Sequence, residues 1–153
     1  HWVGRGKGGS KTTDLAAIAL SWLECLAAPL DEGYTLASDQ DQARRLLTRA
    51  QGLITRTPGL DRLFEVQSWQ IVHRTTGARV VALAADAAGA EGTVSPLYLV
   101  DELPQWTNTR AARALWDAAY SSIPKGMNLP GGLRFAVIGH AGIEGSWQHR
   151  LYE

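Results

Sequence analysis

Two short groups of polar residues carry side chains that could do chemistry together. Lys11 and Thr12 follow a glycine-rich run, and Asp101 and Glu102 follow a run of apolar residues. A lysine ammonium neutralises phosphate oxygens, hydroxyl and carboxylate oxygens are the ligands that Mg²⁺ prefers, and a neighbouring glutamate can act as a general base. Together these groups indicate hydrolysis of a nucleoside triphosphate, with ATP and Mg²⁺ as the expected substrate and metal.

The glycine-rich run, residues 4–13, has the sequence GRGKGGSKTT. Glycines allow several backbone N–H groups to point at one anion, and a helix that follows adds the positive end of its dipole. A flexible linker can have a similar composition, but an apolar helical segment begins immediately after this run, which a linker does not need. The run therefore predicts a phosphate-binding loop of the Walker A kind. Its expected nucleotide-binding residues are Gly6, Lys7, Gly8, Gly9, Ser10, Lys11, Thr12 and Thr13.

The loop departs from the regular pattern G-x-x-x-x-G-K-[ST]. Ser10 stands where a glycine would precede the lysine, and Arg5 stands where the first glycine would be. Two explanations are open. Either Ser10 adopts the backbone conformation that glycine usually provides, or the loop is one residue longer and is counted from Gly4 and Gly9.

The acidic group ends the segment 97–102, LYLVDE, which begins with four consecutive apolar residues. Such a run favours a parallel strand covered on both faces, and ligands bind at the carboxyl ends of these strands in open α/β sheets. The segment predicts a Walker B strand, in which Asp101 holds Mg²⁺ and Glu102 orients the attacking water. Any strand can end in acidic residues, so this prediction depends on the phosphate loop upstream.

The elements that must position these groups follow from periodicity and turn residues. Further strands are expected at 33–37, 64–72, 79–85 and 133–138, with a tight turn at 75–77 and a loop at 86–95. Four helices are expected. The first covers 11–26, and the second begins at a capping box formed by Ser38 and Asp41. The third covers about 109–121 after a cap at Thr107 or Asn108, and the fourth begins at Ser146.

The composition suits one globular domain. The chain has 153 residues, 45% of them hydrophobic, and its 15 basic and 15 acidic residues give a formal net charge of zero. Composition therefore forces no attraction to nucleic acid or to an anionic membrane, and contact with DNA would need a local basic patch. No apolar run reaches the length of a membrane span, so we expect a soluble protein. The single cysteine, Cys25, rules out an internal disulfide and is expected in the core.

One helical stretch carries a basic stripe. Arg45, Arg49 and Arg56 recur on the side opposite the apolar positions of the helix expected after Ser38. The usual role of such a stripe is solvation. The alternative is a surface for DNA or for the phosphate of a neighbouring subunit.

The order of these motifs resembles the ATPase domain of the large terminase subunit of tailed bacteriophages, the motor that packages DNA into the procapsid. The matching segments are residues 4–13, 37–43 (ASDQDQA) and 97–103 with Trp106 close behind. The last match is 138–147, in which Gly139, His140, Ala141 and Gly142 are similar to the coupling motif of the family. The family commonly has two hydroxyl residues where Gly139 and His140 stand.

The resemblance implies a three-layer α/β P-loop NTPase fold, with a mostly parallel central sheet flanked by helices. It implies one ATPase domain over residues 1–153, incomplete at both ends and without the nuclease domain of the family. It also implies an Mg²⁺-dependent ATPase in the cytoplasm of a bacterial host. This ATPase would move viral double-stranded DNA as a homo-oligomeric ring, with the portal and the small terminase subunit as partners and no membrane.

For individual residues, the resemblance implies an extra catalytic cation at Arg5 or Lys7. It also implies an arginine supplied by the adjacent subunit, for which Arg45 and Arg49 are the candidates. Two other functions are open: a module that binds nucleotide without hydrolysing it, and another P-loop ATPase such as a helicase-like motor.

Overall fold

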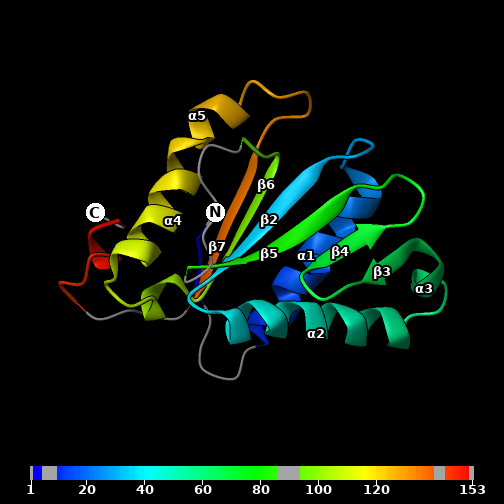
Figure 1. Ribbon diagram of the computed structural model, residues 1–153, viewed down its shortest axis with the longest axis horizontal. Helices are drawn as coiled ribbons and strands as arrows, with labels where there is room; N and C mark the ends of the chain where they lie inside the picture. The colour runs from blue at the N-terminus through cyan, green and yellow to red at the C-terminus, as the bar shows by residue number, and fades with distance from the viewer. Residues whose placement is uncertain (1, 5–9, 86–93, 140–143, 152–153) are drawn as a thin grey trace.

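The chain folds into one mixed sheet with helices on both faces (Figure 1). The computed structural model describes residues 2–4, 10–85, 94–139 and 144–151, and for residues 2–4 it describes the backbone. The strands are β1 (Trp2–Gly4), β2 (Glu32–Ala37), β3 (Phe64–Val66), β4 (Gln70–His73), β5 (Arg79–Ala84), β6 (Leu97–Asp101) and β7 (Arg134–Gly139). The helices are α1 (Lys11–Cys25), α2 (Gln40–Arg56), α3 (Leu60–Leu63), α4 (Arg110–Ser121) and α5 (Ile123–Gly126), with 3₁₀ turns η1 (Leu103–Gln105) and η2 (His149–Leu151).

The seven strands lie in the order β1-β7-β6-β2-β5-β4-β3. The first five of them are parallel to one another, while β4 and β3 extend one edge in antiparallel fashion. The strand β7 therefore separates β1, which precedes the phosphate loop, from β6, which ends in Asp101. The predicted three-layer arrangement with a mostly parallel sheet is confirmed.

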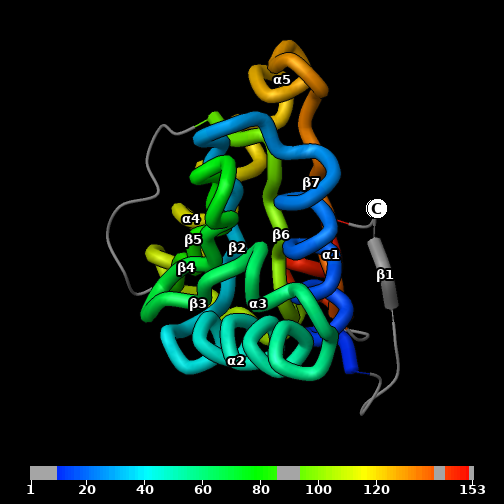
Figure 2. The backbone as a smooth tube through the Cα atoms, turned by 90° about the vertical axis from the view of Figure 1, so that its right-hand side faces the viewer, coloured from blue at the N-terminus to red at the C-terminus, as the bar shows by residue number. Residues whose placement is uncertain are grey.

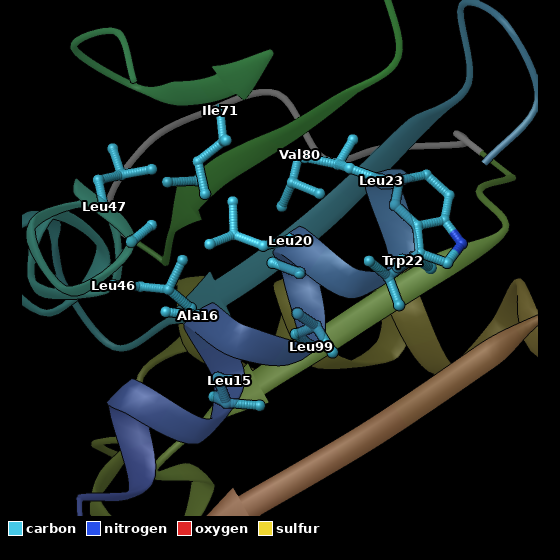
Figure 3. Close-up of a cluster of buried hydrophobic side chains, with 14 of the residues drawn as sticks. Leu15, Ala16, Leu20, Trp22, Leu23, Leu46, Leu47, Ile71, Val80 and Leu99 are labelled. Atoms are coloured by element: carbon cyan, nitrogen blue, oxygen red, sulfur yellow. The ribbon is translucent and has the colours of Figure 1, made fainter. Parts of the chain in front are cut away.

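Alternate residues of the sheet face two separate cores. Leu97 and Leu99 of β6 pack in a cluster with α1 and α2, whereas Tyr98 and Val100 pack in a second cluster with α4. Figure 3 shows the first cluster, in which Ala16 and Leu20 of α1 lie toward Leu46 of α2. Leu15 lies toward Leu99 of β6. Burial on both faces explains why residues 97–100 of β6 are all apolar rather than alternating with polar ones. Figure 1 shows α4 on one side of the sheet and α1 and α2 on the other, and Figure 2 shows the molecule from the side on which α3 lies.

Two helices begin at other residues than expected. The cap of α2 is Asp39 rather than Ser38: the Asp39 carboxylate accepts a hydrogen bond from the Gln42 N–H (2.9 Å), and the Ser38 hydroxyl donates to that carboxylate. This backbone donor, followed by the Ser38 hydroxyl, lowers the pKa of Asp39. The cap of α4 is Thr109, whose hydroxyl accepts from the Ala112 N–H (3.1 Å).

Three other expectations are wrong in detail. The expected strand 64–72 is two strands, because the Gln67 N–H donates to the Gln70 carbonyl (2.8 Å) and reverses the chain between them. Cys25 is exposed at the last position of α1, since Trp22 and Leu23 occupy the buried side of that turn. After Ser146 the chain forms the short turn η2 rather than an α-helix over 149–151.

Of the helices that are described, none combines the length and the apolar character needed to cross a membrane.

Candidate active site

The four residues singled out for chemistry lie together where α1 begins and β6 ends. The Lys11 Nζ is 3.0 Å from the Glu102 Oε1, and the Thr12 hydroxyl donates to the Asp101 Oδ2 at 3.1 Å. The Lys11 side chain is 8% exposed and that of Glu102 is 16% exposed. An ion pair and a hydrogen bond thus join Lys11 and Thr12 to the two carboxylates. Thr12 and Asp101 are 89 positions apart in the chain.

Ser10 caps α1 in a left-handed conformation, with φ 52° and ψ 30°. Its carbonyl accepts hydrogen bonds from the N–H groups of Thr13 (2.9 Å) and Asp14 (3.1 Å), and its side chain makes no capping hydrogen bond. Glycine adopts this conformation without steric penalty, which explains why the regular motif has glycine at this position. Ser10 therefore takes the backbone role of that glycine, which favours the first of the two explanations for the irregular loop.

We expect Ser10→Gly to raise the free energy of unfolding by about 0.5–1 kcal/mol, because relief of left-handed strain outweighs the greater flexibility of glycine. Urea unfolding measures this change. The matched control is Ser21→Gly, at an exposed interior position of α1, which should lower stability by about 0.5 kcal/mol. Equal losses in the two variants would contradict the strained conformation of Ser10.

The Asp101 carboxyl is almost completely buried, being 3% exposed. Burial, as the largest cause, raises its pKa to about 6; the hydrogen bond from Thr12 opposes this rise and the negative charge of Glu102 adds to it. The charges of Lys11 and Arg45 lower the pKa by smaller amounts. Arg45 lies on α2 of the same chain, so its positive charge acts on its own site; its role toward an adjacent subunit stays a prediction.

The oxygens at this position suit Mg²⁺. Among the described residues, none donates a hydrogen bond to the buried Asp101 Oδ1. This oxygen can therefore accept a metal ion, and the Thr12 hydroxyl lies beside the other carboxylate oxygen, Oδ2. Together they offer the hard oxygen ligands that Mg²⁺ requires. In the described part of the chain no cluster of three or more acidic, histidine or cysteine side chains could hold a metal. Magnesium needs no such cluster, since waters and substrate phosphates commonly complete its shell.

In the absence of metal, we expect Asp101→Asn to stabilise the fold at neutral pH. The raised pKa means that folding disfavours the charged form, so the contribution of Asp101 to stability is complete below about pH 4 and is lost as pH rises through about 6. With a chelator present, the free energy of unfolding of the variant should therefore exceed that of the wild type by on the order of 3 kcal/mol at about pH 7.5. At about pH 4 the two values should be equal. Urea unfolding at both pH values measures the difference. A pH-independent difference would contradict the assignment.

Backbone contacts fix the acidic end of β6. Glu102 is left-handed, with φ 49° and ψ 41°, and its N–H donates to the Ile138 carbonyl of β7 (2.8 Å). The Trp106 Nε1 donates to the Asp101 carbonyl (3.0 Å). Strained backbone of this kind persists where surrounding contacts enforce it, and it is frequent at functional sites. Residues that follow the motif thus fix the backbone from which both carboxylates extend.

Gly139 is needed for close packing at the same edge. A Cβ at this position would lie 2.8 Å from the Cδ of Pro104 and 3.7 Å from the Glu102 Oε2. Gly139 also pairs with Gly4, at the start of the phosphate loop. The contact between Pro104 and Gly139 joins distant segments and had no signal in the sequence, whereas the occurrence of Trp106 soon after Asp101 hinted at the local hydrogen bond between them.

Several predicted residues lie outside the described part of the chain. These are Arg5, Gly6, Lys7, Gly8 and Gly9 of the loop, and His140, Ala141 and Gly142 of the segment similar to the coupling motif. Thr13 lies in the first turn of α1, and Arg49 is exposed on α2.

Comparison of sequences gives no relative: no protein-family model matches this chain, and neither does any curated protein. Comparison of structures finds similar proteins. The HK97 bacteriophage large terminase is similar with a TM-score of 0.70 and 18% identity, over 90% of this chain and 28% of that one. The large terminase ATPase domain of Thermus phage P74-26 is similar with a TM-score of 0.63 and 16% identity, over 94% of this chain and 61% of that one.

A third structure, the large terminase of a thermophilic bacteriophage, has a TM-score of 0.59 and 9% identity, with 90% of this chain and 32% of that one covered. The chain thus spans less than two thirds of each of these proteins. The likeness confirms the fold that the motifs imply. The chain has the fold of the ATPase domains of phage large terminases.

Proposed function

We propose that this chain binds ATP with Mg²⁺ and hydrolyses it. The observation that carries the proposal is the meeting of Lys11 with Glu102 (3.0 Å) and of Thr12 with Asp101 (3.1 Å) at one edge of the sheet. A cation for phosphate, two oxygen ligands for metal and a carboxylate for water are the groups that phosphoryl transfer needs.

In this proposal each side chain has a separate task. Lys11 leaves its ion pair with Glu102 and neutralises the phosphate oxygens, while Thr12 and Asp101 hold the metal. When bound, Mg²⁺ neutralises charge on the β- and γ-phosphate oxygens. Glu102, released from Lys11, orients the attacking water and accepts its proton. The loop residues Arg5 and Lys7 supply further positive charge.

We further propose that hydrolysis serves the movement of double-stranded viral DNA into a procapsid. The support is the fold, which the chain shares with the HK97 large terminase and the P74-26 large terminase ATPase domain. As the ATPase part of such a motor, the chain would work in the host cytoplasm as a homo-oligomeric ring with the portal and the small terminase subunit. An arginine from the adjacent subunit, Arg45 or Arg49, would complete each site.

The proposal is tested by measuring nucleotide binding and phosphate release separately. Titration calorimetry with ATP and Mg²⁺ should show binding, and a phosphate-release assay should show turnover that stops when a chelator removes the metal. Binding without turnover, also at high protein concentration where a ring would form, would favour the non-hydrolysing module. Absence of binding would contradict both functions.

A second comparison addresses the kind of motor. If the chain belongs to a packaging motor, procapsids that carry the portal should stimulate turnover more than single-stranded nucleic acid does. Stimulation by single strands alone would favour a helicase-like motor.

A further inference from the structure

The outward side of α2 is strongly basic although the whole chain has no net charge. Four arginines, Arg44, Arg45, Arg49 and Arg56, are exposed on this helix, and Asp41 is its only acidic residue. At about 3.6 residues per turn, Arg45, Arg49 and Arg56 fall on one stripe, which spans about 16 Å at a rise of about 1.5 Å per residue. Positive charge is therefore concentrated along one helix.

A groove lies on another side of α2, between this helix and the turn from β3 to β4. Its volume is 340 Å³. The residues that line it are Arg44, Leu47, Thr48, Gln51, Val66, Gln67 and Ser68. The polar groups among them are hydroxyls, amides and a guanidinium, and none is acidic. Arginine, serine, threonine and glutamine side chains are the common donors to phosphate oxygens in nucleic-acid complexes.

Arg45 acts on the carboxylates of Asp39 and Asp101, whereas among the described residues Arg44, Arg49 and Arg56 form no ion pair. The Arg44 guanidinium lies 4.7 Å from the centre of the Trp69 ring, which fixes its position without neutralising it. The nearest acid along the β3 edge, Glu65, is already paired with Arg74 at 2.9 Å. We call the exposed arginines of α2 and the groove residues together the basic α2 surface.

We infer that the basic α2 surface binds the phosphate backbone of double-stranded DNA. Charge complementarity selects a polyanion. A straight row of arginines, with a further arginine and neutral donors in the groove on the next side of the same helix, suits a regular backbone rather than exposed bases. The choice of a duplex rests on the proposed function; the choice of nucleic acid rests on the surface itself.

The surface also begins at the candidate active site. Helix α2 starts after β2, a neighbour of β6, and the charge of Arg45 reaches Asp101. DNA held by Arg49, Arg56 and the groove would therefore be attached to the same helix whose first turns lie near the metal ligand. This placement connects the proposed DNA surface and the candidate active site through one helix.

The test is fluorescence anisotropy of a labelled duplex of mixed sequence, about 30 base pairs long, without nucleotide and at several salt concentrations. For Arg49→Glu/Arg56→Glu, we expect affinity at about 0.1 M salt to fall at least about tenfold. The slope of log affinity against log salt should become shallower by about 1.8, since about 0.9 is lost with each phosphate contact. A single added charge in the groove, Gln51→Glu, should weaken binding about threefold or more.

The matched control is Arg110→Glu, an exposed arginine in the first turn of α4 on the opposite side of the sheet. It makes the same kind of charge reversal and should leave affinity within about twofold. Equal losses in the control and the α2 variants, or no binding by a wild type of normal melting temperature, would overturn the inference. So would tighter binding of a single strand that depends on Trp69, because this would indicate base stacking. The assay omits ATP, so a wild type that binds duplex but does not hydrolyse ATP would contradict only the proposed function.

Discussion

Glu102→Gln is expected to abolish ATP turnover while nucleotide binding is kept or strengthened. The amide cannot accept the proton of the attacking water, and loss of a general base slows a reaction about 10²–10⁴-fold. In the wild type the nucleotide must displace Glu102 from Lys11, to which it is bound at 3.0 Å. Without that ion pair, we expect affinity to be equal or up to about tenfold tighter, which corresponds to about 1.4 kcal/mol.

Phosphate release and titration calorimetry measure the two effects of Glu102→Gln separately. The control is Glu24→Gln, a change of the same type at an exposed position at the opposite end of α1 from Lys11. Turnover at the wild-type rate in Glu102→Gln would exclude Glu102 as the base. Markedly weaker binding would show instead that the carboxylate contributes to holding the nucleotide.

Lys11→Ala is expected to lower nucleotide affinity about 100-fold, because charge-assisted hydrogen bonds to phosphate each contribute about 1.5–3 kcal/mol. The same change removes the ammonium from beside the mostly buried Glu102 carboxylate. We therefore expect the metal-free and nucleotide-free protein to lose about 1–3 kcal/mol of stability as well. Calorimetry and urea unfolding measure the two losses.

The double variant Lys11→Ala/Glu102→Ala separates these effects. Removing both partners should restore most of the lost stability, while nucleotide affinity stays low. Lys125→Ala, which removes an exposed lysine on α5, serves as the control for a loss of positive charge. If Lys11→Ala bound nucleotide as tightly as Lys125→Ala does, the phosphate-binding role of Lys11 would be wrong.

The central part of the fold could be predicted because its signals are local and mutually consistent. The apolar run before Asp101 indicates a strand buried on both faces, and β6 is such a strand. The glycine-rich run followed by an apolar helix indicates an anion-binding loop, and the structure places Lys11 and Thr12 beside the two carboxylates. Each motif predicts where the other must lie.

What the sequence could not provide depends on contacts between distant segments or on single hydrogen bonds. Asp39 and Thr109 cap the two helices although neighbouring residues have equally suitable side chains. The direction of the backbone decides which side-chain oxygen reaches the N–H groups of the helix. The exposure of Cys25 depends on which side of the last turn of α1 faces the sheet. The left-handed conformation of Ser10 shows that a departure from a motif in residue type can preserve it in backbone geometry.

The position of β7 has a mechanical consequence. Since β1 and β6 are each hydrogen-bonded to β7 and not to each other, the backbones of these two strands stand two strand spacings apart, about 10 Å. Lys11 and Thr12 span this separation through their contacts with Glu102 (3.0 Å) and Asp101 (3.1 Å). Ile138 and Gly139 are in register with Asp101 and Gly4, so a shift of this one strand would displace the ends of both neighbouring strands at once.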